Sequence, residues 1–241
     1  MLSLRHTAPM ATSLSRAPAP ARRTWSSSPR SATSEPSTSA TPEGVPRSYF
    51  YDVDVHGQLF LSTAKHRNVA TAYRDPRFLD TFFARLRRNA TLETEEAKDA
   101  RAGGFEFVSE CMGEINYVRP DRDGTALVFQ ALEGQDLRYG GTLTRPFDPA
   151  SLRVDASTGY LFHPSPVGRR TKRSRVGPFS LLRSSLVLEN FADSLELDDH
   201  GGGSLEFDGQ RHRIEPLQPG DIWRRQDMGK GVVTQKSKVY D

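Results

Sequence analysis

The stretch YFYDVDVHGQLFL, residues 49–61, decides how the rest of the chain is interpreted. Tyr49, Tyr51 and Val53 occupy alternate positions, and a second short apolar run follows Gly57. Aromatic and β-branched residues favour strands, and glycine can adopt the positive φ that a tight reversal requires. The stretch therefore predicts a β-hairpin, and we place the start of the folded domain at residue 48.

Residues 1–47 differ in composition from everything that follows. They are dominated by Ser, Thr, Ala, Pro and Arg, and have too few apolar side chains to form a core. Six arginines and two glutamates give them a net charge of +4, so the total of +3 leaves −1 for residues 48–241. A near-neutral domain lacks the concentrated positive charge that non-specific binding to DNA or to an anionic membrane requires.

Residues 1–25 contain arginine and serine but no acidic residue, which is typical of a mitochondrial transit peptide. The pattern Arg23-Thr24-Trp25 predicts cleavage near Ser26 and a location in the mitochondrial matrix, and residues 26–47 are interpreted as a disordered linker. The alternative is that the whole leader is an ordinary disordered tail.

Cys111 is the only cysteine, so the chain cannot form an internal disulfide or a cysteine-based metal cluster, as suits a reducing compartment. No apolar run approaches the roughly 20 residues that span a bilayer, which predicts a soluble protein without a membrane span.

One amphipathic helix is predicted from Asp75 onward. Asp75 can cap the first turn, and Pro76 suits the first helical position because its missing N–H is not needed there. Apolar residues then recur at helical spacing on one face: Phe78, Leu79, Phe82, Phe83 and Leu86.

Short strands are predicted on both sides of a polar, partly helical excursion at residues 89–104. Candidates include residues 105–108, 115–118, 125–132, 137–143, 186–188, 204–207 and 210–214, the last two flanking the turn Asp208-Gly209. The sequence shows no alternation of strands and helices, so a parallel sheet is not expected. We predict a single α+β domain over residues 48–217, with an antiparallel-rich curved sheet, one principal amphipathic helix and a loosely ordered tail over residues 218–241.

Several motifs together resemble a known family. They are YFYDVDVHGQLFL, NVATAYRDPRFLDTFFARLRRN, FVSECMGEINYVRPDRD, LRYGG, RPFDP, GYLFHPSP and RSSLVLE, in this order. This series is similar to a mitochondrial family of unknown function that includes the human chromosome-eight open-reading-frame product. The resemblance covers residues 49–189, and more loosely extends to 217; the basic insertion at 169–175 and the longer tail depart from it. It implies a mitochondrial location and supplies no reaction or catalytic residue.

The segment around Cys111 is the densest group of reactive residue types. A thiolate nucleophile would need a base, for which His163 is the candidate, and an orienting group, for which Glu114 or Asn116 could serve. The alternative is a buried structural cysteine, which is how free cysteines usually behave. His56, His66, Asp52 and Asp54 could form a metal site beside the hairpin, but a solvated turn is favoured because no two histidines have ligand spacing.

A basic segment supplies the other candidate binding residues, namely Arg169, Arg170, Lys172, Arg173 and Arg175. It could bind RNA or another anion, but no aromatic residue is interleaved for base stacking. The adjacent glycines at 140–141 and 201–203 match no nucleotide-binding motif and predict turns.

The leading hypothesis is a non-catalytic mitochondrial module that binds a protein partner or a small ligand. The alternatives are a thiol-dependent hydrolase or transferase using Cys111, Glu114 and His163, and RNA binding through the basic segment. The sequence does not identify a cofactor, and it predicts no metal site.

Overall fold

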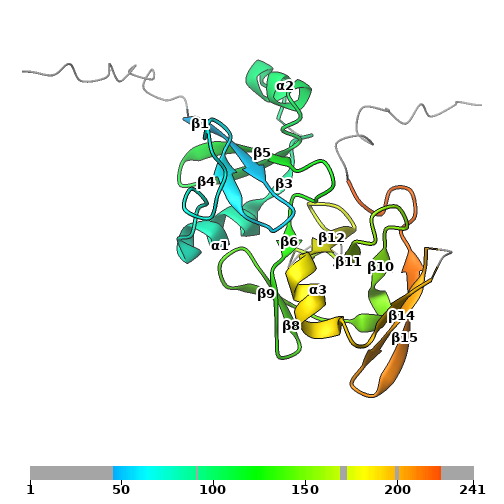
Figure 1. Ribbon diagram of the computed structural model, residues 1–241. Coiled ribbons are helices and arrows are strands. Elements are labelled where there is room, and N and C mark those ends of the chain that lie inside the picture. The colour runs from blue at the N-terminus through cyan, green and yellow to red at the C-terminus, as the bar shows by residue number, and fades with distance from the viewer. Residues whose placement is uncertain (1–45, 91, 169–172, 199–200, 224–241) are drawn as a thin grey trace, which may run out of the picture. The chain divides into compact units, whose positions relative to one another are not determined.

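The computed structural model describes residues 46–90, 92–168, 173–198 and 201–223, and the architecture below refers to these. Three sheets and three α-helices make up this part of the chain (Figure 1). None of the described helices is long and apolar enough to cross a membrane.

The first sheet has five strands in the order β2-β1-β5-β4-β3. Tyr51 of β1 pairs with Leu61 of β2, so the hairpin predicted at residues 49–61 is confirmed. The strands are β1 (Ser48–Val53), β2 (Leu59–Leu61), β3 (Arg87–Arg88), β4 (Phe107–Cys111) and β5 (Glu114–Pro120).

The second sheet has seven strands in the order β13-β14-β15-β10-β11-β12-β6, and the third has the order β7-β8-β9. The Asp208-Gly209 turn joins β14 to β15, as predicted, because Phe207 pairs with Gln210. The strands of the second sheet are β6 (Val128–Phe129), β10 (Arg153–Val154), β11 (Leu161–Pro164), β12 (Phe179–Leu182), β13 (Leu195–Leu197), β14 (Gly203–Phe207) and β15 (Gln210–Pro216). Those of the third sheet are β7 (Ala131–Glu133), β8 (Asp136–Tyr139) and β9 (Leu143–Pro146).

Antiparallel pairs predominate among the described strands, as the antiparallel-rich prediction expected, and three pairs are parallel. Strand β1 runs parallel to β5, β10 to β15, and β12 to β6. Each of these pairs joins strands that are distant in sequence. They do not belong to local strand–helix–strand units, which is why the sequence pattern did not indicate them.

The predicted helix is α1 (Pro76–Arg85), and its cap is the expected one because the Asp75 carboxylate accepts from the Phe78 N–H at 2.7 Å. Phe82 and Phe83 are buried, and the Phe82 ring contacts Tyr51 edge-on at 5.4 Å between ring centres. The apolar face of α1 therefore covers the first sheet. The helix is shorter than the apolar pattern suggested, because Arg87 and Arg88 pair with β4 as strand β3.

Two shorter helices accompany α1 in the described part of the chain, so the prediction of one principal helix is confirmed only in part. Helix α2 (Glu95–Ala102) lies in the polar excursion, with Ala97 and Ala100 buried. Helix α3 (Ser184–Phe191) contains residues 186–188, which were predicted as a strand. A strand would place Leu186 and Leu188 on one face, whereas Leu186 is buried and Leu188 is exposed. A 3₁₀ turn spans Pro149–Ser151.

The turn between β4 and β5 offers a test of stability. Met112 and Gly113 both have positive φ, at 55° and 76°, and the Met112 side chain is exposed. Asparagine tolerates this conformation far better than methionine. We expect Met112→Asn to raise the free energy of unfolding by about 1 kcal/mol, as measured by urea denaturation. Met112→Leu is the control, because leucine tolerates a positive φ as poorly as methionine does. An equal gain in stability from Met112→Leu would contradict the explanation.

Candidate functional site

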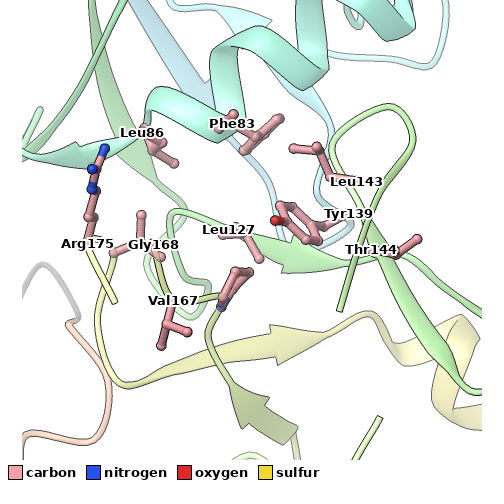
Figure 2. A pocket seen from close by; sticks show the side chains of 12 residues that line it. Phe83, Leu86, Leu127, Tyr139, Leu143, Thr144, Val167, Gly168 and Arg175 are labelled. Carbon is pink, nitrogen blue, oxygen red and sulfur yellow. The ribbon is translucent and has the colours of Figure 1, made fainter. Parts of the chain in front are cut away.

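A cavity of about 730 Å³ is the candidate site, and it lies within the size range of small-molecule pockets. Helix α1 borders it together with strands β8 and β9 and the segments that follow β11 and precede β12 (Figure 2). Its apolar wall is contributed by Phe83, Leu86, Leu127, Leu143, Val167 and Val176.

The sequence places these apolar residues here for separate local reasons. Phe83 lies on the face of α1 that turns toward the sheets, and Leu86 is the residue at which that helix ends. Leu127 is buried immediately before β6, and Leu143 begins β9 after the Gly140–Gly141 turn. Val167 follows β11 and Val176 precedes β12, so the wall is assembled from five separate segments of the chain.

Tyr139 supplies a polar group within this wall. Its ring packs edge-on against Phe129 at 5.9 Å between centres, and Figure 2 shows its hydroxyl directed toward the cavity on the side of Leu127. Burial raises the pKa of the phenol above its ordinary value, so the hydroxyl stays protonated and can donate. No described residue hydrogen-bonds to this hydroxyl, which leaves it available to a bound molecule.

Arg175 provides the positive charge at the rim. Its backbone carbonyl accepts from the Arg88 N–H at 3.0 Å, which holds the backbone of Arg175 in place. Figure 2 shows the guanidinium beside Leu86. The side chain is exposed and pairs with no carboxylate among the described residues. The cavity thus combines an apolar wall with the Tyr139 phenol, the Thr144 hydroxyl and one cation.

A family model described as "Domain of unknown function (DUF4505)" matches residues 39–217. The chain belongs to this family. The matched region of the DUF4505 domain contains every element that borders the cavity. No solved structure matches the chain.

The described residues on both sides of 169–172, in and next to the basic segment of the DUF4505 domain, contribute to the lining of this cavity. Residues 169–172, which include Arg169, Arg170 and Lys172, lie outside the described residues. Val167 forms an isolated bridge with Ser174, and Val167, Gly168 and Arg175 line the cavity. Arg173 is exposed and does not line it. RNA binding through this segment stays a prediction.

Cys111 lies elsewhere in the domain, at the end of β4 and opposite Glu114 of β5. The side chain is buried, and the Asn116 amide donates to the sulfur at 3.3 Å. Burial raises the pKa of the thiol, and the nearby Glu114 carboxylate raises it further. Both effects disfavour the thiolate that a nucleophile needs, so this environment matches that of a buried structural cysteine.

His163 lies on β11 in the second sheet, whereas Cys111 belongs to the first sheet, and no described contact joins the two side chains. The imidazole Nε2 accepts from the Asp148 N–H at 3.0 Å, so Nδ1 carries the proton and donates to the Pro164 carbonyl at 3.0 Å. Burial lowers the pKa of His163 to about 4. His163 is therefore a neutral, buried side chain that hydrogen-bonds to the backbone of Asp148 and Pro164. The structure does not place it beside the Cys111 thiol.

The residues near the opening hairpin have structural partners. Asp52 is buried and accepts from Arg67 at 2.5 Å and from Arg119 at 2.7 Å, while Asp54 accepts from the N–H groups of the hairpin turn. His56 is exposed in that turn. Among the described residues no group of three or more His, Cys, Asp or Glu side chains is placed to hold a metal ion.

Sequence reasoning singled out Arg175 but missed Tyr139 and the apolar wall. The motif LRYGG did contain a signal, because a tyrosine at the end of a strand is followed there by a glycine turn. That signal indicated a turn and gave no indication of a cavity.

Proposed function

We propose that the domain is a non-catalytic binding module whose cavity accepts a small amphiphilic anion. The observation that carries this proposal is the pairing of the Tyr139 hydroxyl, which has no described partner, and the Arg175 guanidinium with a wall of six apolar side chains. The wall would take the apolar part of the ligand, and the two polar groups would orient its carboxylate, sulfonate or similar head group.

The lining also argues for binding in preference to catalysis. Its described members include no His, Cys, Asp, Glu or Lys side chain. General acid–base chemistry near neutral pH uses such groups, since they can exchange a proton there. Tyr139 holds its proton more tightly than an ordinary tyrosine, and Arg175 is a permanent cation.

The ligand proposal predicts the outcome of a displacement experiment. The full chain is expected to bind the fluorescent anion anilinonaphthalene sulfonate, and octanoate should displace it while octanol, with the same chain length but no charge, should compete about tenfold less well. Arg175→Ser is expected to weaken octanoate about tenfold and to leave octanol unchanged. Tyr139→Phe should weaken octanoate by a smaller factor, because one neutral hydrogen bond is lost.

Arg173→Ser is the matched control, because it removes one cation from the same segment without touching the cavity. Equal losses from Arg173→Ser and Arg175→Ser would show general charge attraction and contradict the proposed site. Circular dichroism melting checks that each variant remains folded, since the dye also binds partly unfolded chains.

The proposed setting is the mitochondrial matrix, with residues 1–25 as a cleaved transit peptide, 26–47 as a linker and 48–217 as the binding domain. The composition of the leader and the resemblance to the mitochondrial family that includes the human chromosome-eight open-reading-frame product support this arrangement. Sequencing the N-terminus of the protein recovered from mitochondria tests it. A new N-terminus near Ser26 is expected, and an intact Met1 would contradict the import proposal.

A further inference from the structure

A second, smaller cavity of about 240 Å³ borders the same helix and the same strand β8 as the first, and also the turn that follows β8. Its described lining differs in kind, because three arginines and a histidine contribute to it and no carboxylate does: Arg74, Arg138, Arg183 and His56. Backbone from Gly140 and Gly141 completes one side. Such a concentration of cations favours an anionic occupant.

Four carboxylates near this cavity already accept hydrogen bonds: Asp54 and Asp75 from backbone N–H groups, and Glu133 and Asp80 from the donors given next. Glu133 accepts from the Arg138 Nε at 2.5 Å, and so compensates that one cation. Asp80 accepts from the N–H groups of Gly141 at 3.0 Å and Thr142 at 2.7 Å. The side chains of Arg74 and Arg183 form no ion pair with any described carboxylate. Arg74 and Arg183 are therefore the two cavity cations that have no carboxylate partner among the described residues.

Arg138 is held in place before any ligand arrives. Gln130 donates to the Gly57 carbonyl at 2.7 Å and accepts from Arg138 Nη1 at 3.5 Å. The same Nη1 lies 3.3 Å from the Gly141 carbonyl, and Glu133 fixes Nε. A cation fixed by three neighbours loses little side-chain freedom when it binds an anion.

Arg183 is the residue whose hydrogen bonding is incomplete. Its Nε is buried and has no hydrogen-bond partner. Buried donors are nearly always satisfied in folded proteins, and an acceptor bound in the cavity would satisfy this one. The other unpaired cation is Arg74, whose Nη2 donates only to the neutral Val69 carbonyl among the described residues, at 2.5 Å.

We propose that this cavity binds a phosphate dianion, either as inorganic phosphate or as the terminal phosphate of a small monoester. Two uncompensated arginines match a charge of about −2, whereas a monocarboxylate would leave one of them unneutralised. The guanidinium fork also suits the tetrahedral arrangement of phosphate oxygens. The Tyr73 and Leu79 side chains at the cavity provide apolar surface for the organic part of a monoester.

Isothermal titration calorimetry on the full chain tests the proposal, with inorganic phosphate, phenyl phosphate and succinate as separate probes. Both phosphates are expected to bind more tightly than succinate, and a preference for phenyl phosphate would identify a monoester as the physiological class. Arg183→Gln is expected to weaken phosphate about tenfold or more. Arg74→Gln should act in the same direction, and its exposed position keeps the test valid if Arg183→Gln does not fold.

Arg77→Gln is the matched control, because Arg77 is an exposed cation on α1 that does not line the cavity. It should leave phosphate affinity unchanged within about twofold. Absence of phosphate binding at millimolar concentration would overturn the proposal, as would equal losses in the Arg77 and Arg74 variants. Tighter binding of succinate than of either phosphate would overturn the phosphate assignment. Octanoate binding tests the larger cavity separately.

Discussion

Acidification from about pH 7.5 to about pH 5 is expected to lower the free energy of unfolding by about 2 kcal/mol through His163 alone. The side chain is fully buried, and its ring lies between Phe129 and Phe147 at 5.6 and 5.7 Å from their ring centres. Burial is the main reason that its pKa falls from 6.5 to about 4, although the hydrogen bond to the Pro164 carbonyl opposes the shift. Protonating Nε2 would also set two N–H groups against each other, because the Asp148 N–H already points at it.

The sign follows from the two pKa values. The folded-state value lies below the unfolded one, so the unfolded chain takes up a proton that the folded chain refuses. Stability is therefore fully present above about pH 6.5 and is lost as the pH falls toward 4. Urea unfolding across this range measures the loss directly.

His163→Gln is the informative variant, since its side-chain carbonyl can still accept from the Asp148 N–H but cannot titrate. We expect it to be less stable than the wild type at about pH 7.5. Between about pH 7.5 and about pH 5 it should lose about 2 kcal/mol less unfolding free energy than the wild type does. An unchanged slope would mean that the buried imidazole does not control acid stability. His212→Gln, at a partly exposed position on β15, is the control and should keep most of the wild-type slope.

Gly141→Ala is expected to destabilise the domain by about 3 kcal/mol. The turn between β8 and β9 presses directly on the start of α1. A Cβ at position 141 would lie 2.5 Å from the Pro76 carbonyl oxygen and 2.7 Å from its Cα. Both are backbone atoms, so neither can rotate away, and the turn or the helix must shift. A shift would also weaken the hydrogen bonds that Asp80 accepts from Gly141 and Thr142.

Gly124→Ala is the matched control. A Cβ at position 124 would meet its nearest atom, the Asp121 Cβ, at an ordinary distance of 3.5 Å. We expect its free energy of unfolding to remain within about 0.5 kcal/mol of the wild type. Urea denaturation of the two variants side by side distinguishes contact at the turn from a general effect of replacing glycine, and equal losses would contradict the steric explanation.

The features that the sequence predicted correctly are local ones. The opening hairpin, the Asp75 cap of α1 and the Asp208-Gly209 turn each depend on a few adjacent residues whose preferences agree with the final structure. Residues 186–188 show where local preference fails. Leu-Val-Leu suits a strand, but the Phe191 ring stacks on Phe147 at 5.3 Å, and a helix satisfies that tertiary contact.

The candidate sites were harder to predict because their residues come together only in the fold. Phe83, Leu127, Tyr139 and Arg175 line one cavity, although more than 90 residues separate the first from the last. Cys111 and His163 show the converse, since both carry reactive groups and the structure gives each its own set of partners. Residue type indicates which chemistry is available, whereas spatial placement decides whether it can be used.

The parallel pairing of β1 with β5 has a consequence for how the protein is made. Ser48 pairs with Ile115 and Val53 with Pro120. During synthesis β1 therefore cannot pair with β5 until residue 120 has left the ribosome. During that interval one edge of β1 offers unpaired N–H and C=O groups, which are the groups through which nascent chains associate with one another. Closing so long a loop also makes this pairing slow relative to the local hairpins. Fragments that end before β5 are therefore expected to aggregate, and any shortened version of the protein needs to retain residues 48–120 together.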